Sequence, residues 1–179
     1  MLTRPFSDFS VREATAADLP RVSEIKVRNW ADTYGTLVDA AILGPFLDVQ
    51  AQEQTLARKA NLPATLLLVA QDRSSSVIGF SLTFLDEDPE PLLESLHVVS
   101  ESRGTGVGSL LMRVTAERIL ERGYRTMRLG VVAGNVSAAN FYERLGGVHV
   151  GREPAGWADG VWHEIFRWPD LETLTLPRG

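Results

Sequence analysis

Three glycines at alternate positions, Gly104, Gly106 and Gly108, stand between an apolar, β-branched stretch and a segment with helical periodicity. Glycines in such a turn let the backbone approach a ligand closely and aim successive N–H groups into one concavity. The N-terminus of the following helix adds about half a positive charge to that concavity. The turn is therefore predicted to bind an anion, and phosphate suits it best.

Two common phosphate-binding motifs do not fit this turn. A Walker A loop requires Lys and then Ser or Thr after its last glycine, whereas Ser109 and Leu110 follow Gly108. A dinucleotide fingerprint requires G-x-G-x-x-G opening a parallel βαβ unit, whereas the spacing here is G-x-G-x-G after a predicted hairpin. A tight strand-to-helix connection without a ligand remains the structural alternative.

Side chains that could perform acid–base chemistry lie on both sides of the turn. Glu94 and His97 precede it, and Tyr142 lies in a predicted helix downstream. Glu94 and His97 would face opposite sides of a regular strand, but a β-bulge would shift that alternation. Burial among leucines would raise the pKa of Glu94 and suit it to accept a proton, whereas His97 is equally well explained by packing.

The elements that must position these residues follow one another along the whole chain. Hydrophobic periodicity and turn residues predict a strand near Val11 and a helix opened by Thr15 and Asp18. Further helices are predicted over 48–60, 107–122 and 135–145, and further strands over 64–72, 77–85, 92–99, 125–132, 148–152 and 161–168. This order predicts one α/β (α+β) domain, residues 1–179, built on a mixed sheet.

Two stretches carry a resemblance to a known family. Residues 103–108, Arg-Gly-Thr-Gly-Val-Gly, have the form Arg/Gln-x-x-Gly-x-Gly and resemble the pyrophosphate-binding motif of the GNAT superfamily, the general-control-related N-acetyltransferases. Residues 135–147, NVSAANFYERLGG, resemble the second cofactor motif of that family, one helix and one strand downstream. "EIKVRNWADTYG" and "WHEIFRW" are similar to the first helix and last strand of a small bacterial-type subgroup. The resemblance implies a mostly antiparallel sheet of about six to seven strands, splayed in the middle and flanked by about four helices.

The resemblance also implies an enzyme that transfers an acetyl group from acetyl-CoA to a primary amine of a small molecule, peptide or protein. The cofactor would lie between splayed strands, with its pyrophosphate on the backbone N–H groups of the glycine turn and its pantetheine arm along residues 96–98. The cofactor-binding residues implied in this way are Leu96, His97, Val98, Arg103, Gly104, Thr105, Gly106, Val107, Gly108, Ser109, Asn135, Ala138, Phe141 and Tyr142.

Catalytic roles follow from the same resemblance. Tyr142 would donate a proton to the departing thiolate as a general acid. Some family members carry a Glu at the end of the strand before the second motif, where this chain has Gly130. Glu94, His97 or a water chain is then left as the proton acceptor. The amine pocket would be formed by aromatic side chains that make cation–π contacts, namely Trp30, Tyr34, Trp157 and Trp162.

Composition excludes several other classes of function. Net charge is −5 and no basic block occurs, so no nucleic-acid partner is expected. No apolar run reaches the roughly 20 residues that span a bilayer, so no membrane segment is expected. The chain has no cysteine, which excludes disulfides and thiol catalysis and fits a reducing cytoplasm. The three histidines, His97, His149 and His163, have no metal-ligand spacing, so no metal is expected.

Two questions stay open at this level. Family members often pair, so a homodimer is an expectation of the resemblance. A CoA-binding sensory or structural domain without transferase activity is the alternative function, favoured by the missing acid at Gly130 and opposed by the presence of Tyr142.

Overall fold

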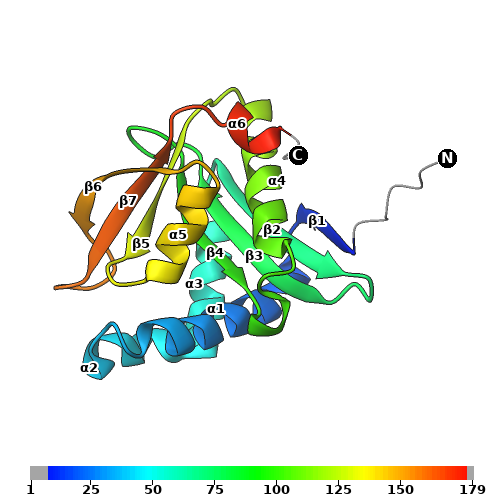
Figure 1. Cartoon of the computed structure of the whole chain (residues 1–179). Coiled ribbons are helices and arrows are strands. Elements are labelled where there is room, and N and C mark those ends of the chain that lie inside the picture. The colour runs from blue at the N-terminus through cyan, green and yellow to red at the C-terminus, as the bar shows by residue number, and fades with distance from the viewer. Residues whose placement is uncertain (1–7, 177–179) are drawn as a thin grey trace.

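A computed structural model describes residues 8–176. One seven-stranded sheet has the order β1-β2-β3-β4-β5-β7-β6 (Figure 1). Its strands are β1 (Phe9–Glu13), β2 (Thr65–Asp72), β3 (Val77–Phe84), β4 (Leu92–Val98), β5 (Met127–Val132), β6 (Val148–Pro154) and β7 (Trp162–Trp168). The α-helices are α1 (Leu19–Tyr34), α2 (Ala40–Leu43), α3 (Val49–Ala60), α4 (Val107–Glu121), α5 (Val136–Arg144) and α6 (Glu172–Thr175).

The predicted sheet and the four longer helices are confirmed, and two short helices are added. The single-turn helices α2 and α6 have four residues each, which is too short for a periodic pattern to reveal. Thr15 and Asp18 form the predicted cap, but around a 3₁₀ turn at Ala16–Asp18, with the Thr15 backbone N–H donating to Asp18 Oδ2 at 2.7 Å. Helix α1 begins one residue later.

The sheet splays between β4 and β5. These strands are parallel and pair at only two positions, Leu92 with Arg128 and Leu93 with Leu129. On its other edge, β4 pairs with β3 as far as Val98. The backbone of β4 beyond Leu93 therefore has a strand neighbour on one side only, and the sheet opens there.

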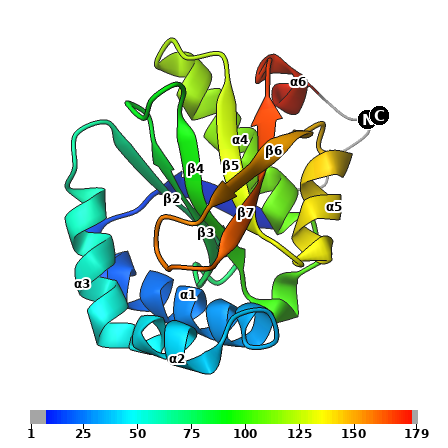
Figure 2. The ribbon, with the colours of Figure 1, turned by 90° about the vertical axis from the view of Figure 1, so that its left-hand side faces the viewer.

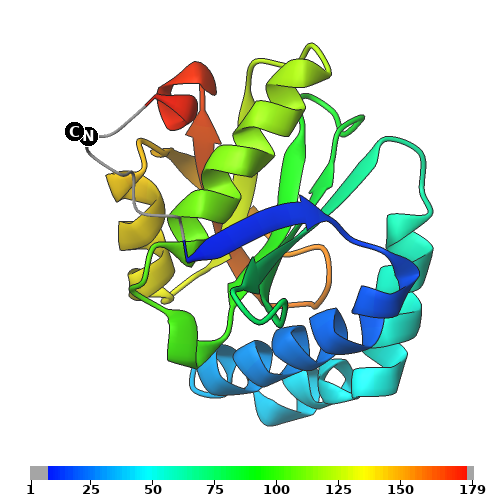
Figure 3. The same ribbon diagram turned by 90° about the vertical axis from the view of Figure 1, so that its right-hand side faces the viewer.

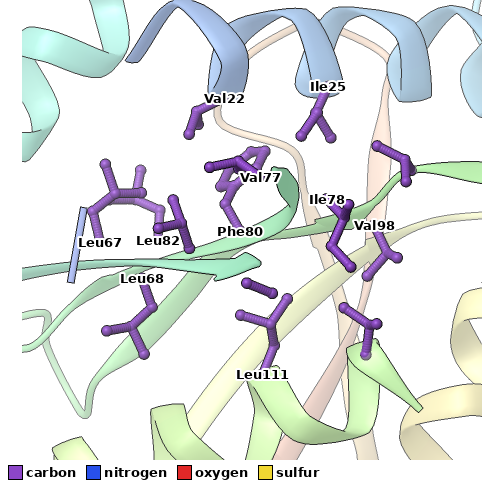
Figure 4. Packing of buried hydrophobic residues seen from close by; sticks show 14 of the residues in the cluster. Val22, Ile25, Leu67, Leu68, Val77, Ile78, Phe80, Leu82, Val98 and Leu111 are labelled. Carbon is purple, nitrogen blue, oxygen red and sulfur yellow. The ribbon is translucent and has the colours of Figure 1, made fainter. Parts of the chain in front are cut away.

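Helices cover the two faces of the sheet differently. Helices α1 and α3 pack on one face against β2, β3 and β4, and α4 crosses the other face (Figures 2 and 3). Figure 4 shows Val22 and Ile25 of α1 near Phe80 on one side of the sheet, with Leu111 of α4 on the other. All four side chains are at most 2% exposed, so apolar burial fixes both helices against the sheet.

The described residues include no helix that is long and apolar enough to cross a lipid bilayer.

Candidate active site

A cavity of about 1510 Å³ follows the opening between β4 and β5. Its turn end is formed by the glycine turn, the start of α4 and helix α5. Its helical end is formed by α1 and α3, through Lys26, Asn29, Trp30, Thr33, Tyr34, Gln52, Thr55 and Lys59. Residues 93–98 of β4 and 129–131 of β5 line the passage between the two ends. The cavity is larger than the roughly 300–1,000 Å³ of a drug-sized site, so it has room for a long ligand and a second small one.

The turn end presents backbone N–H groups. Gly104 and Gly106 have φ of 75° and 95°, in the left-handed region that favours glycine, and Gly106 caps α4. Within the described chain, the N–H groups of residues 104–109 donate no hydrogen bond to the protein. Unpaired N–H groups at the start of a 15-residue helix form an anion site, so the phosphate-binding prediction fits this geometry.

Helix α5 lies against the start of α4. A Cβ atom on Gly108 would lie 3.1 Å from Phe141 Cζ, so the two helices approach this closely because position 108 has no side chain. Asn135 caps α5 as predicted, since its Oδ1 accepts from the Ala138 backbone N–H at 3.2 Å. Asn135, Ala138 and Phe141 all line the cavity.

Side chains of the turn serve mostly to hold the loop. The Arg103 Nη2 donates to Asn29 Oδ1 at 2.9 Å, and Asn29 Nδ2 in turn donates to the Val98 carbonyl at 3.0 Å. Thr105 Oγ1 donates to the Ser102 carbonyl at 2.6 Å, and the Val107 side chain is fully buried. Of the predicted cofactor-binding set, Thr105 and Val107 do not line the cavity, so their role is limited to their backbone N–H groups.

Tyr142 lines the cavity from α5 and is held by aromatic neighbours. Its ring meets Trp168 edge-on at a centroid distance of 5.9 Å and is 8% exposed. Its hydroxyl makes no hydrogen bond to any residue in the described part of the chain. Burial raises the pKa of Tyr142 above its ordinary value, so the phenol keeps its proton and can donate it.

A β-bulge brings Glu94 and His97 to the same side of β4. Ser95 pairs with Leu82 and Leu93 pairs with Thr83, which leaves Glu94 without a partner on β3. Glu94 then contacts Lys59 of α3, and His97 Nδ1 lies 3.4 Å from Asn29 Nδ2 of α1. Both side chains therefore face the helical end.

The charge state of Glu94 differs from the prediction. Burial alone would raise its pKa, as the sequence suggested, but the charges of Lys59 and Lys26 outweigh that effect. Hydrogen bonds from Lys59 and Ser95 act in the same direction, and the pKa of Glu94 lies below its usual value. The expected raised pKa was wrong because the sequence does not show which cations reach this carboxylate.

His97 is a neutral packing residue at the pH of cells. Burial and the charge of Lys26 lower the pKa of His97 to about 3. Its ring packs on Phe80 with a centroid distance of 5.3 Å. A histidine with so low a pKa is a weak proton acceptor.

An aromatic cluster closes the helical end. Trp30 lies 5.2 Å from Tyr34, 5.7 Å from Phe46 and 4.8 Å from Trp157 between ring centroids. All four line the cavity, so three of the four predicted aromatic residues lie together there. Phe46 was not predicted, because the short 3₁₀ segment that carries it has no signal in the sequence.

Trp162 does not belong to this cluster. It is 42% exposed, lies outside the residues that line the cavity, and has the Arg152 guanidinium over its ring at 5.4 Å. The next residue of β7, His163, does line the cavity. Successive strand residues face opposite sides of a sheet, so the prediction for Trp162 is corrected.

Lys26, Lys59 and His163 line the cavity but were not among the predicted site residues. Lys26 and Lys59 come from α1 and α3, and His163 comes from β7 beside Gly130. His163 Nε2 accepts a hydrogen bond from Trp157 Nε1 at 3.2 Å, and burial lowers the pKa of His163. The rarity of lysine could have drawn attention to Lys26 and Lys59, because the sequence contains only these two lysines. Within the described residues, no three His, Asp or Glu side chains are grouped as a metal site would require.

Comparisons with known proteins agree with this geometry. The chain is 28% identical over 176 residues to the L-methionine sulfoximine/L-methionine sulfone acetyltransferase of Pseudomonas paraeruginosa, covering 93% of each chain. It is 25% identical over 170 residues to the N-acetyltransferase YuaI of Bacillus subtilis, covering 92% of this chain and 95% of that one. The PaiA N-acetyltransferase of Thermoplasma acidophilum, solved with coenzyme A, shares the fold with a TM-score of 0.74 at 20% identity, covering 89% of this chain and 97% of that one.

The family model of the GNAT acetyltransferases matches residues 26–147, which run from the second half of α1 through the glycine turn to the end of α5. That range contains both motifs on which the resemblance was based and most of the cavity lining. Acetyl-CoA is the acetyl donor of this family. The chain belongs to the acetyltransferase (GNAT) family.

Proposed function

We propose that this acetyltransferase transfers the acetyl group of acetyl-CoA to the primary amine of a small molecule held at the helical end of the cavity. The observation that carries the proposal is the continuity of one cavity. Unpaired N–H groups lie at its turn end, the Tyr142 side chain lies on its wall, and aromatic and charged side chains lie at its helical end.

The turn end fits the diphosphate of the cofactor. The N–H groups of residues 104–109 have no protein acceptor, and oxygens of a diphosphate would satisfy them. The open edge of β4 beyond Leu93 offers backbone groups to the amide groups of the pantetheine arm, as an added strand would. When bound, acetyl-CoA supplies a thioester whose carbonyl carbon the amine attacks.

Glu94 is proposed to receive the amine. Its ionised carboxylate faces the helical end, and an ammonium group hydrogen-bonds strongly to a carboxylate. The amine must lose a proton before it can attack. Because the pKa of Glu94 is lowered, its carboxylate is proposed to hold the amine, and water in the cavity is proposed to carry the proton away. His97, with its pKa of about 3, is left a packing role.

Tyr142 is proposed as the general acid. Its protonated hydroxyl has no hydrogen-bond partner among the described residues and lies in the cavity between the two ends. A phenol at this position can donate its proton as the thiolate leaves. Its aromatic neighbours, Trp168 and Phe141, hold the ring in one orientation.

The size and walls of the helical end favour a small acceptor. It is closed by the packed rings of Trp30, Tyr34, Phe46 and Trp157, which leave little room for a long chain. The Pseudomonas relative carries the names of two amino-acid derivatives as its acceptors. Both observations favour a free amine over a peptide or protein.

An assay of CoA release tests the proposal. Purified protein with acetyl-CoA and a panel of amino acids, polyamines and aminoglycosides should release CoA with at least one of them and yield the acetylated product by mass spectrometry. Tight binding of acetyl-CoA with no transfer to any amine would favour the alternative, a CoA-binding domain without activity.

Location and assembly are proposed from composition and surface. The absence of cysteine fits a cytoplasmic protein. Strand β6 is an edge strand with Val148 and Val150 more than half exposed, and it is a suitable surface for a homodimer. Light scattering of the purified protein would measure the mass of the assembly.

A further inference from the structure

Lys26 is a largely buried lysine whose ammonium group lines the cavity with neither a hydrogen-bond acceptor nor an ion-pair partner among the described residues. Its residue is 4% exposed, on the face of α1 that lines the helical end. Its Nζ lies 5.0 Å from the centroid of the Trp30 ring, but it makes no hydrogen bond or ion pair with any residue in the range 8–176. An ammonium carries three N–H donors, and burying it without an acceptor is costly. The cavity therefore holds a charged donor whose acceptor must come from elsewhere.

The charges around Lys26 do not balance. The carboxylate of Glu94 already pairs with Lys59, and the charges of both lysines lower its pKa. His97 and His163 are neutral because their pKa values are lowered, and burial raises the pKa of Tyr34 to about 12. Two ammonium groups thus face one carboxylate, and the Arg103 guanidinium, which donates to Asn29, adds further positive charge. The helical end therefore has an excess of positive charge.

The choice of lysine here departs from the rest of the chain. Of the 18 basic residues, two are lysines, Lys26 and Lys59, and the other 16 are arginines. Both lysines line the helical end, and the charge of Lys59 contributes to lowering the pKa of Lys26. Lysine is a compact point charge, whereas arginine is a wide planar fork. A compact charge suits a confined site that receives one small anionic group.

We infer that Lys26 binds the carboxylate of the acceptor, so that the acceptor is an amino acid whose amine is directed to Glu94. This inference rests on the proposed function and names its substrate class. A simple monoamine would bring a further positive charge into a region that already holds an excess. An amino acid brings the missing negative charge together with the amine, and its carboxylate supplies the acceptor that Lys26 lacks.

The test compares acceptors that differ only in the carboxyl group. The common L-amino acids and L-methionine sulfone are assayed beside their carboxamides, together with 3-(methylsulfonyl)propylamine, which is methionine sulfone without its carboxyl group. For the best amino acid, the wild type should show a kcat/KM about 10- to 100-fold above that of its carboxamide, the range of one hydrogen bond between charged groups.

Lys26→Met should abolish that preference. The ratio of kcat/KM for the amino acid to that for its carboxamide should fall by about 10- to 100-fold, mainly through a higher KM for the acid. Arg28→Met is the matched control, since Arg28 lies on the same helix, is exposed and pairs with Glu101 outside the cavity. It removes the same charge and should leave the ratio unchanged.

The outcomes separate this inference from the proposed function. If the wild type acetylates carboxamides as well as amino acids, or if Lys26→Met lowers both equally, the carboxylate site is wrong although transfer itself stands. If no acceptor releases CoA while acetyl-CoA still binds, the proposed function fails. Isothermal titration of acetyl-CoA with the Lys26→Met variant shows whether a loss of activity instead reflects a damaged turn end.

Discussion

The imidazole of His163 occupies the space that a side chain at Gly130 would need. A Cβ atom on Gly130 would lie 2.5 Å from His163 Nδ1. Some family members carry an acid at this strand position, and here the neighbouring strand fills the space with a ring. The ring is fixed from its other edge, because His163 Nε2 accepts from Trp157 Nε1.

Gly130→Ala should therefore destabilise the protein by about 1–3 kcal/mol, since the added methyl overpacks against the ring. The double variant Gly130→Ala/His163→Ala should recover part of that loss, as expected for residues in direct contact. Denaturant unfolding measures both. Gly156→Ala is the control, because a Cβ there meets no atom within 4 Å. Additive effects of the two substitutions would show that no contact exists.

Tyr142→Phe should lower kcat by about 100-fold or more, because the proton donor for the leaving thiolate is removed. The affinity for acetyl-CoA, measured by calorimetry, should change little, since the ring and its contacts with Trp168 remain. Tyr124→Phe removes an exposed hydroxyl bonded to Asp86 and serves as the matched control. Full turnover in Tyr142→Phe would assign the proton to another group.

Glu94→Gln should lower kcat/KM for the amine by about 100-fold, because a neutral amide does not pair with an ammonium group as a carboxylate does. Acetyl-CoA binding should persist, since the carboxylate is not part of the turn end. Glu101→Gln changes an exposed acid that pairs with Arg28 and should have no such effect. Equal losses in the two variants would argue that Glu94 has no specific role.

Lys26 should titrate below the ordinary lysine value of 10.5, because burial disfavours its charged form. With carbon-13 at the lysine ε-carbon, the two lysines give two NMR signals, and the one that Lys26→Met removes should titrate below 10.5. A signal with an unshifted pKa would mean that Lys26 is more solvated than the structure indicates.

The same shift makes a prediction about stability. The charged form of Lys26 is disfavoured in the folded state, so Lys26→Met should raise the free energy of unfolding at neutral pH, by about 1 kcal/mol or more. Between the folded pKa and 10.5 the unfolded chain binds more protons, so the stability of the wild type rises with pH in that window. The advantage of Lys26→Met should therefore shrink as the pH rises toward 10.5. An advantage that stays constant would contradict a lowered pKa.

The sequence predicted the fold well because each of its signals is local. Gly106 and Asn135 act on the residues next to them, and the alternation in β5 needs no knowledge of distant contacts. The charge state of Glu94 could not be predicted in this way. It depends on Lys26 and Lys59, which lie far from it in the chain and reach it through packing of α1 and α3. The prediction that Trp162 lines the amine pocket was wrong for a related reason. The residue type alone does not show which face of the strand lines the cavity.

The two lysines have one more consequence. An enzyme that acetylates amines carries amines of its own, because lysine side chains are amines and most proteins expose many of them. Here every lysine side chain of the 179-residue chain faces the cavity, and arginine, whose guanidinium stays protonated, carries the basic charge elsewhere. Away from the cavity this protein therefore offers no lysine to its own chemistry, and any acetyl-lysine found in the purified protein would lie on a lysine that lines the cavity.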